Sequence, residues 1–294
     1  MNNQIFYIVD VFTDQKYAGN QLAVFKWPKE LTDAEMLKIT KEMNYSETTF
    51  ILSDKQPNQG YDVRIFTPEE EVPFAGHPTL GTAYIIHREI REDKRVILNL
   101  KVGQIPVNFE HKKGGSDILW MEQKEPSFGK NFDINTIFPV LNLKDNDIDD
   151  RFPIQDVSTG LPFIIIPLKS LDAVKRANVD RKKYLELIKD TRAKAILIFC
   201  PQTYHQENDL NVRVFVEYYG IPEDPATGSG NGCLAAYLCK YRYFGKRQIS
   251  VRVEQGYEIG RPSLIYLKAE EILEGRINVS VGGSVVMVAK GELV

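Results

Sequence analysis

Alternating apolar and polar positions predict strands near the start of the chain. IFYIVDVF alternates from Ile5, and NQLAVFKW follows a turn at Gly19 and Asn20, so the two stretches predict an opening hairpin. A period near 3.6 residues in LTDAEMLKITKEMN predicts an amphipathic helix that begins with Thr32 or Asp33 as its N-cap. ETTFIL and YDVRIFT then return to strand patterns.

The same order of patterns returns in the second half. STGLPFIIIPL predicts a strand, SLDAVKRANVDRKKYLELIKD a helix, and AKAILIFC and LNVRVFVEY two more strands. Arg64-Ile65-Phe66 precedes Gly76 by 12 positions, and Arg213-Val214-Phe215 precedes Gly228 by 15. From there AGHPTLGTAY and TGSGNGCLAAY align almost without a gap. We therefore expect an internal duplication with two similar halves.

The boundary between the halves is expected near a charged, proline-rich stretch at residues 124–155. The predicted domains are residues 1–124 and 125–283, and a last strand at about 284–294 is expected to return to the first domain.

Composition narrows the class of protein. The 294 residues are 43% hydrophobic and 26% charged, with a net charge of -3, which excludes a disordered chain and gives no basic excess for nucleic acid. No basic segment leads into a long apolar run, so we expect a cytoplasmic protein without a membrane span. The three cysteines, at 200, 233 and 239, lack C-x-x-C spacing and are expected to be buried thiols.

Two stretches, VPFAGHPTLGTAYII and EDPATGSGNGCLAAYL, place small residues immediately before an apolar helix pattern. The start of a helix has unpaired N–H groups and a partial positive charge, and Gly76, Gly228 and Gly230 would let an anionic ligand approach it. His77 and Ser229 stand where a side chain can reach the same ligand. The alternative is that these glycines only allow close helix packing, but two corresponding stretches favour a ligand held between the halves.

Two carboxylates are candidates for proton chemistry. Glu47 begins an apolar strand, where desolvation would raise its pKa toward that of a general base, although glutamates in turns are more often solvated. Asp224 precedes the second glycine run, where an acid can equally cap a turn. The sequence alone leaves both alternatives open.

Cofactor motifs are missing from the sequence. The four histidines show no H-x-H or H-E-x-x-H spacing, the glycines after Thr227 do not fit G-x-G-x-x-G, and no G-K-[ST] follows them. We therefore expect no metal, flavin or nicotinamide cofactor.

A set of motifs spread over nearly the whole chain resembles the PhzF family of phenazine-biosynthesis isomerases. The resemblance implies an α+β fold of two pseudo-symmetric, diaminopimelate-epimerase-like halves, each a curved, mostly antiparallel, barrel-like sheet around a central apolar helix. It also implies an active site in the cleft between the halves, and a homodimer. The motifs are DVFTDQKYAGNQLAVF, KEMNYSETTF, RIFTPEEEVPFAGHPTLGTA, EDPATGSGNG, EQGYEIGRPSLIYLKAE and RINVSVGGSVVMVAKGEL.

The resemblance also implies roles for individual residues. The catalytic glutamate of the family falls on Glu47, and its substrate-binding histidine, aspartate and serine fall on His77, Asp224 and Ser229. Gly76 and Gly228 match the glycines whose backbone N–H groups bind a substrate carboxylate, with Gly230 beside them. The implied reaction moves a proton on trans-2,3-dihydro-3-hydroxyanthranilate without a cofactor, with Glu47 taking and returning it and with Asp224 and His77 positioning the substrate or assisting the transfer.

One comparison within this superfamily bears on the mechanism. Diaminopimelate epimerases and proline racemases carry a cysteine immediately before each ligand-binding glycine, but here those positions are Ala75 and Thr227. Cys233 lies more than a helical turn further on and is expected to point away from the ligand. Two-thiol epimerisation therefore has little support. An epimerase with another pair of bases, or a non-catalytic carboxylate-binding protein, stays open as an alternative.

The chain departs from the family pattern at a few positions. Gln21 stands where many relatives have proline, and Asn231 and Gly232 extend the small-residue run after Ser229. We expect these differences to alter the size of the pocket. The physiological substrate does not follow from the family resemblance.

Overall fold

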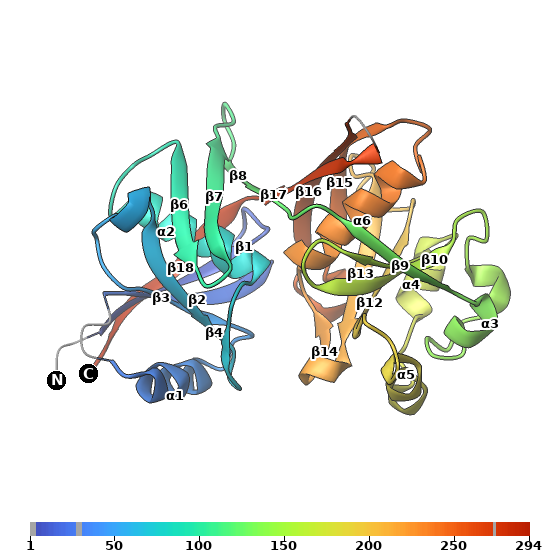
Figure 1. Cartoon of the computed structure of the whole chain (residues 1–294), viewed down its shortest axis with the longest axis horizontal. Coiled ribbons are helices and arrows are strands. Elements are labelled where there is room, and N and C mark those ends of the chain that lie inside the picture. Colours follow the sequence, from blue (N-terminus) through green and yellow to red (C-terminus); the bar gives the residue numbers. More distant parts are fainter. Residues whose placement is uncertain (1–3, 28–30, 273–274) are drawn as a thin grey trace. The chain divides into compact units, whose positions relative to one another are not determined.

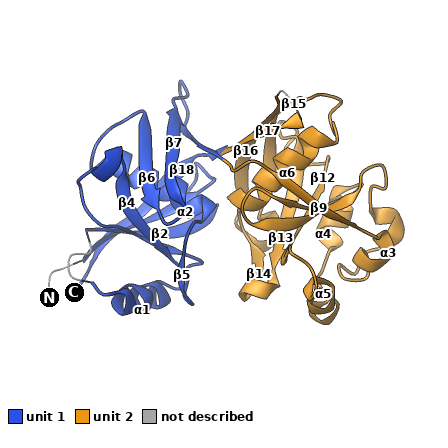
Figure 2. Ribbon diagram, in the orientation of Figure 1, with its two compact units in different colours: residues 1–122, 282–294 blue, residues 123–281 orange. Residues whose placement is uncertain are grey.

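The computed structural model describes residues 4–27, 31–272 and 275–294. The chain forms two compact units: unit 1 comprises residues 1–122 and 282–294, and unit 2 comprises residues 123–281 (Figure 2). Each unit contains its own apolar helix, α2 (Gly76–Glu89) in unit 1 and α6 (Gly228–Lys240) in unit 2.

Unit 1 is a curved, mostly antiparallel sheet around α2 (Figure 1). The helix contacts strands along the whole sheet, from one end to the other, which shows that the sheet wraps around it. The pairings among these strands are parallel only at β2/β3 and β4/β6, and the others are antiparallel. In spatial order the strands are β18 (Val285–Leu293), β1 (Gln4–Val11), β2 (Asn20–Lys26), β3 (Thr48–Ile51), β4 (Tyr61–Phe66), β6 (Arg95–Leu100), β7 (Gly103–Glu110) and β8 (Ile118–Glu122), with β5 (Glu71–Val72) beside β4.

Unit 2 repeats this pattern of pairings around α6. Its parallel pairs, β11/β12 and β13/β15, correspond to those of unit 1, and β9 pairs with β10 as β18 pairs with β1. The expected duplication is therefore confirmed at the level of strand order and direction. The strands are β9 (Ser127–Phe132), β10 (Ile154–Ser158), β11 (Pro162–Pro167), β12 (Ala195–Cys200), β13 (Leu210–Val216), β14 (Ile221–Asp224), β15 (Gln248–Gln255), β16 (Ser263–Glu271) and β17 (Ile277–Gly283).

Short helices cover the outer face of each sheet. In unit 1, α1 (Asp33–Met43) begins at Thr32, which forms a capping box with Glu35, so the first of the two expected N-caps is confirmed. Unit 2 has α3 (Ile134–Ile137), α4 (Leu171–Arg176) and α5 (Arg181–Ile188).

The prediction of a single helix over residues 170–190 is wrong, because the helix is interrupted between α4 and α5. The break is explained mainly by contacts with a distant segment of the chain. The backbone N–H groups of Asn178 and Asp180 donate to the carbonyls of Leu141 and Val140, and the side chain of Asp180 caps the start of α5.

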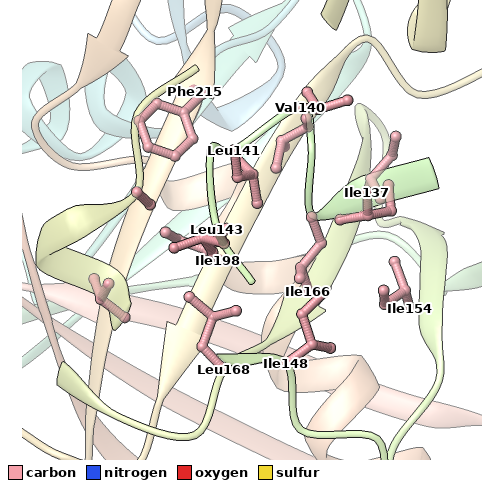
Figure 3. Packing of buried hydrophobic residues seen from close by; sticks show 14 of the residues in the cluster. Ile137, Val140, Leu141, Leu143, Ile148, Ile154, Ile166, Leu168, Ile198 and Phe215 are labelled. Carbon is pink, nitrogen blue, oxygen red and sulfur yellow. The ribbon is translucent and has the colours of Figure 1, made fainter. Parts of the chain in front are cut away.

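The uninterrupted apolar runs of β11 and β12 reflect burial on both faces of the sheet. Phe163 and Leu197 face α6, since a Cβ atom at Gly230 would lie 3.2 and 3.3 Å from their side chains. Their neighbours along each strand pack into an outer core against α3, α4 and α5 (Figure 3). A strand covered on both faces cannot show the alternation of a half-exposed one. The outer core includes Ile137, Val140, Leu141, Leu143, Ile148, Ile154, Ile164, Ile166, Leu168, Ile196, Ile198 and Phe215.

Candidate active site

Glu47 is positioned by the segment that connects α1 to β3. The helix α1 ends at Asn44 in the left-handed conformation, and Glu47 immediately precedes the first residue of β3. That strand is tied to α2 by a hydrogen bond of 2.8 Å between the hydroxyls of Thr82 and Thr49, both buried. The side chain of Glu47 is only 18% exposed. The carboxylate is therefore held next to the central helix in a largely desolvated place.

The first turn of α2 presents backbone N–H groups. The N-cap position is Ala75, whose side chain cannot accept a hydrogen bond, and the first helical residues are Gly76 and His77. Pro78 has no N–H and fits the first turn. The N–H of Thr79 is the first to make an intrahelical bond, to the carbonyl of Ala75. An uncapped, glycine-led helix start of this kind favours an anion such as a carboxylate.

Glu47 and His77 meet at this helix start. The Nε2 atom of His77 lies 3.5 Å from Oε2 of Glu47. Burial lowers the pKa of His77 to about 3, outweighing a hydrogen bond to the backbone of Gln21 that favours the protonated ring. The imidazole is therefore neutral at physiological pH. The contact joins a carboxylate to a neutral imidazole, and it is not an ion pair.

In unit 2 the corresponding helix start is built differently. Thr227 is the N-cap residue of α6, but its hydroxyl donates to the carboxylate of Asp224, the last residue of β14, and does not cap the helix. Gly228 and Ser229 follow as the first helical residues. This start thus combines uncapped N–H groups with an acid fixed beside them.

Gly230 has a packing role of its own. A Cβ atom at this position would lie 3.2 Å from the ring of Phe163 and 3.3 Å from Leu197 and Thr227. These distances are tighter than ordinary side-chain contacts. Close packing of α6 on β11 and β12 therefore accounts for glycine at this position whether or not it also contacts a ligand.

An arginine–glutamate ion pair involves the residue five positions before each helix start, and the sequence analysis missed both pairs. In unit 1, Arg64 binds Glu71 through two hydrogen bonds of 3.0 and 2.5 Å, and the bond holds the pKa of Glu71 below its usual value. In unit 2, Arg213 binds Glu223 through two hydrogen bonds of 2.9 and 2.7 Å. The signal was present, because each glutamate stands five positions before the first glycine of its helix, as Glu71 does before Gly76.

The duplication does not extend to the candidate acid. Glu47 precedes the first residue of β3, and the residue in the same place before β12 is Lys194. Its ammonium group donates to the carbonyl of Ile188 at the end of α5. The two units thus share glycine-led helix starts and arginine–glutamate ion pairs, but a carboxylate occupies this position in unit 1 alone.

The cysteines are buried, as expected. Cys233 is completely buried, its thiol lies 3.4 Å from the carbonyl oxygen of Leu161, and burial raises its pKa to about 12. Burial also raises the pKa of Cys200 to about 11 and that of Cys239 above its usual value. A thiol must ionise to act as a base or nucleophile, so none of the three is poised for that role.

Two further features are absent from residues 4–27, 31–272 and 275–294. No group of three or more histidine, cysteine, aspartate or glutamate residues there could hold a metal ion. Nor does any helix in those ranges have the length and apolar character needed to cross a membrane.

The two similar units, each a curved sheet around a central apolar helix, define a fold of the epimerase-like class. Residues 9–291 match the PhzC-PhzF family of phenazine biosynthesis-like proteins, and the chain belongs to this family. It is 33% identical to a trans-2,3-dihydro-3-hydroxyanthranilate isomerase of Pseudomonas fluorescens over the whole of both chains. It is 32% identical to an uncharacterised isomerase of Clostridium acetobutylicum over 98% of this chain and 97% of the relative.

Solved structures agree with this assignment. A PhzF-family phenazine biosynthesis protein of Bacillus anthracis superposes with a TM-score of 0.91 at 27% identity, and the match covers 100% of both chains. The expected family, the fold and the isomerase class are therefore confirmed.

Proposed function

We propose that this protein isomerises a small cyclic amino-carboxylate, such as trans-2,3-dihydro-3-hydroxyanthranilate, by moving a proton without a cofactor. The observation that carries the proposal is the position of Glu47, a largely buried carboxylate 3.5 Å from neutral His77 at an uncapped helix start. The relative from Pseudomonas fluorescens carries the name of this activity, which supports the choice of substrate class.

In the proposed reaction, Glu47 takes a proton from a ring carbon, and the electron pair of the broken C–H bond delocalises along the conjugated system. The carboxylic acid of Glu47 then returns the proton to another ring carbon. One C–H bond breaks and another forms, so substrate and product have the same composition and no oxidant or reductant is needed. A single group on one face of the ring is sufficient.

Neutral His77 fits this cycle. Its bond to the backbone of Gln21 favours the protonated ring, so the ring acts as the donor there, and Nε2 has no hydrogen-bond partner. Nε2 of the neutral ring is then an acceptor that faces Glu47. When Glu47 carries the proton, its O–H can donate to Nε2, and this stabilises the intermediate in which the enzyme holds the proton.

The residues of unit 2 are proposed to bind the substrate. Asp224 is suited to a substrate amino group, and the first N–H groups of α6, at Gly228 and Ser229, are suited to a carboxylate. Two alternatives have less support. Ala75 and Thr227 replace the paired thiols of related epimerases. A protein that only bound carboxylates would gain nothing from an additional negative charge at Glu47.

The test is nuclear magnetic resonance of trans-2,3-dihydro-3-hydroxyanthranilate with the purified protein in water and in deuterium oxide. We expect one saturated ring C–H signal to disappear and another to appear, with unchanged mass in water. An unchanged spectrum at high enzyme concentration would contradict the proposed substrate. Inversion at one ring carbon, which converts the trans compound to its cis diastereomer without movement of a double bond, would favour an epimerase.

A further inference from the structure

Gln255 connects the end of β15 to the start of α6. It is completely buried and makes four side-chain hydrogen bonds, all to residues 224–231. Its Oε1 accepts from the backbone N–H of Thr227 at 3.2 Å and from the side chain of Asn231 at 2.8 Å. Its Nε2 donates to the carbonyl of Asp224 at 2.8 Å and to the hydroxyl of Thr227 at 3.0 Å.

These contacts use the full capacity of the amide, which has two N–H donors and two lone pairs on oxygen. Rotating the amide by 180° would place its NH₂ group against two donors and its oxygen against the carbonyl of Asp224. The surrounding groups therefore fix the orientation of the Gln255 amide, because all of its own donors and acceptors are used.

The network reaches the candidate site through Thr227. Its hydroxyl accepts from Gln255 and donates its single proton to the carboxylate of Asp224. The direction of that proton is thus set by Gln255, and the proton in turn holds one oxygen of the Asp224 carboxylate. Gln255 also binds the backbone on both sides of Pro225, at Asp224 and Thr227.

Two residues after Gln255 also contact the turn at Pro225. Gly256 has a φ of 79°, and a Cβ atom there would collide with the carbonyl oxygens of Pro225 and Arg261. The hydroxyl of Ser263 bonds the same two carbonyls, at 3.0 and 2.9 Å. The motif EQGYEIGRPS has no part in the proposed proton transfer. Its residues instead pack against the turn at Asp224 and Pro225 and form hydrogen bonds with it.

We propose that Gln255 is a positioning residue, which fixes the Asp224 carboxylate and the start of α6 for substrate binding. This inference rests on the proposed function, because it assigns Asp224 and α6 to the substrate. Gln255 acts through Thr227 and does not itself touch the substrate.

The first measurement is independent of any ligand. Amide hydrogen exchange of the N–H of Thr227 is compared in the wild type, Gln255→Met and Gln248→Met. Gln248 is exposed at the other end of β15, so it is the matched control. We expect exchange at Thr227 to rise at least about tenfold in Gln255→Met, because its acceptor is lost, and to stay unchanged in the control. Equal exchange rates of the Thr227 N–H in all three proteins would show that Gln255 does not hold the start of α6.

The second measurement separates positioning from mere stability. Anthranilate, an aromatic amino-carboxylate with no proton to move, serves as the probe in calorimetry at pH 6 and pH 8. In Gln255→Glu an oxygen replaces Nε2, so the bonds to the Asp224 carbonyl and the Thr227 hydroxyl lose their donor. We therefore expect the affinity for anthranilate at pH 8 to be at least about tenfold below that of the wild type. The defect should shrink at pH 6, because a buried carboxyl is readily protonated and regains one donor. Gln255→Met should show an equal defect at both pH values.

Thr227→Val, which removes only the hydroxyl that links Gln255 to Asp224, gives a second route if a Gln255 variant fails to fold. We expect it to weaken anthranilate binding as well. Wild-type affinity in folded Gln255 or Thr227 variants would overturn the positioning role. A wild-type protein that neither binds anthranilate nor isomerises the substrate would instead contradict the proposed function, and the exchange of Thr227 would then decide the anchoring by itself.

Discussion

Nε2 of His77 and Oε2 of Glu47 lie 3.5 Å apart although 30 positions separate the two residues in the sequence. The hydroxyl bond between Thr49 and Thr82 binds strand β3 to helix α2 near this contact. Because burial keeps His77 neutral, its Nε2 can accept a hydrogen bond from Glu47 once that carboxyl group carries a proton, and no ion pair has to be broken first.

Glu47→Gln should abolish most of the isomerase activity. The amide keeps the size of the side chain but cannot accept a proton, so kcat should fall at least about a hundredfold. Binding of anthranilate should change little, because the helix starts are untouched. The measurements are solvent-deuterium incorporation into trans-2,3-dihydro-3-hydroxyanthranilate and calorimetry.

Glu69→Gln is a matched control, since Glu69 is exposed in the turn after β4, and it should keep wild-type activity. Near wild-type deuterium incorporation by Glu47→Gln would remove Glu47 from its role. Asp224 would then become the next candidate base.

His77 should make the stability of the protein depend on pH. Its pKa is about 3 when folded against 6.5 as the ordinary value, so between these values the unfolded chain binds a proton that the folded protein does not. The contribution of neutral His77 to stability is therefore present above pH 6.5 and is lost as the pH falls toward 3, by at most about 1.4 kcal/mol per pH unit. Urea unfolding of wild type and His77→Asn from pH 4.5 to 7.5 measures this slope, which should be shallower in the variant. Parallel curves for the two proteins would show that His77 titrates normally.

Cys233→Ala should remain an active isomerase. The thiol is buried with its pKa raised to about 12, so it is protonated at any working pH and supplies neither base nor nucleophile. Iodoacetamide at pH 8 should likewise leave the native wild-type protein unmodified at this residue, as judged by mass spectrometry. Loss of activity after the substitution or after iodoacetamide treatment, with the fold intact by circular dichroism, would support a mechanism that uses the thiol.

Arg213→Met should destabilise the protein more than Arg64→Met. Arg213 and Glu223 are 10% and 8% exposed, against 22% and 12% for Arg64 and Glu71, so the glutamate left unpaired in unit 2 is less hydrated. Removing one partner of a buried pair costs about 3–5 kcal/mol, and exposure reduces this cost. Calorimetric unfolding compares the two variants, and an equal or reversed order would contradict the prediction.

Arg213→Met has a further local consequence. Arg213 also donates to the carbonyls of Val174 and Ala177 at the end of α4, at 2.9 and 2.7 Å. Amide exchange in α4 should therefore accelerate in this variant, whereas α1 should be unaffected.

Local patterns predicted the elements whose signals lie within one stretch of sequence. The capping box at Thr32 and the apolar helices after Gly76 and Gly228 are of this kind, and the repeat of the helix motif was enough to predict the duplication. The break near Asn178 could not be foreseen in the same way, because its backbone partners, Val140 and Leu141, are more than 35 positions away.

The candidate site shows the same division. The glycine-led helix starts were visible in the sequence, and the resemblance to the family pointed to Glu47. The 3.5 Å contact of Glu47 with His77 and the neutral state of the imidazole depend on burial, which spacing does not reveal. The role of Gln255 was equally hidden, because its partners begin 24 positions earlier in the chain.

The pairing of β18 with β1 affects the order in which the halves can be completed during synthesis. A ribosome delivers every strand of unit 2 up to residue 281 before it delivers β18, although unit 1 begins first. Until then, β1 pairs with β2 alone and has an open edge, which can pair with other chains. The half encoded first is therefore completed last, and a stop codon before residue 285 would damage the half that carries Glu47.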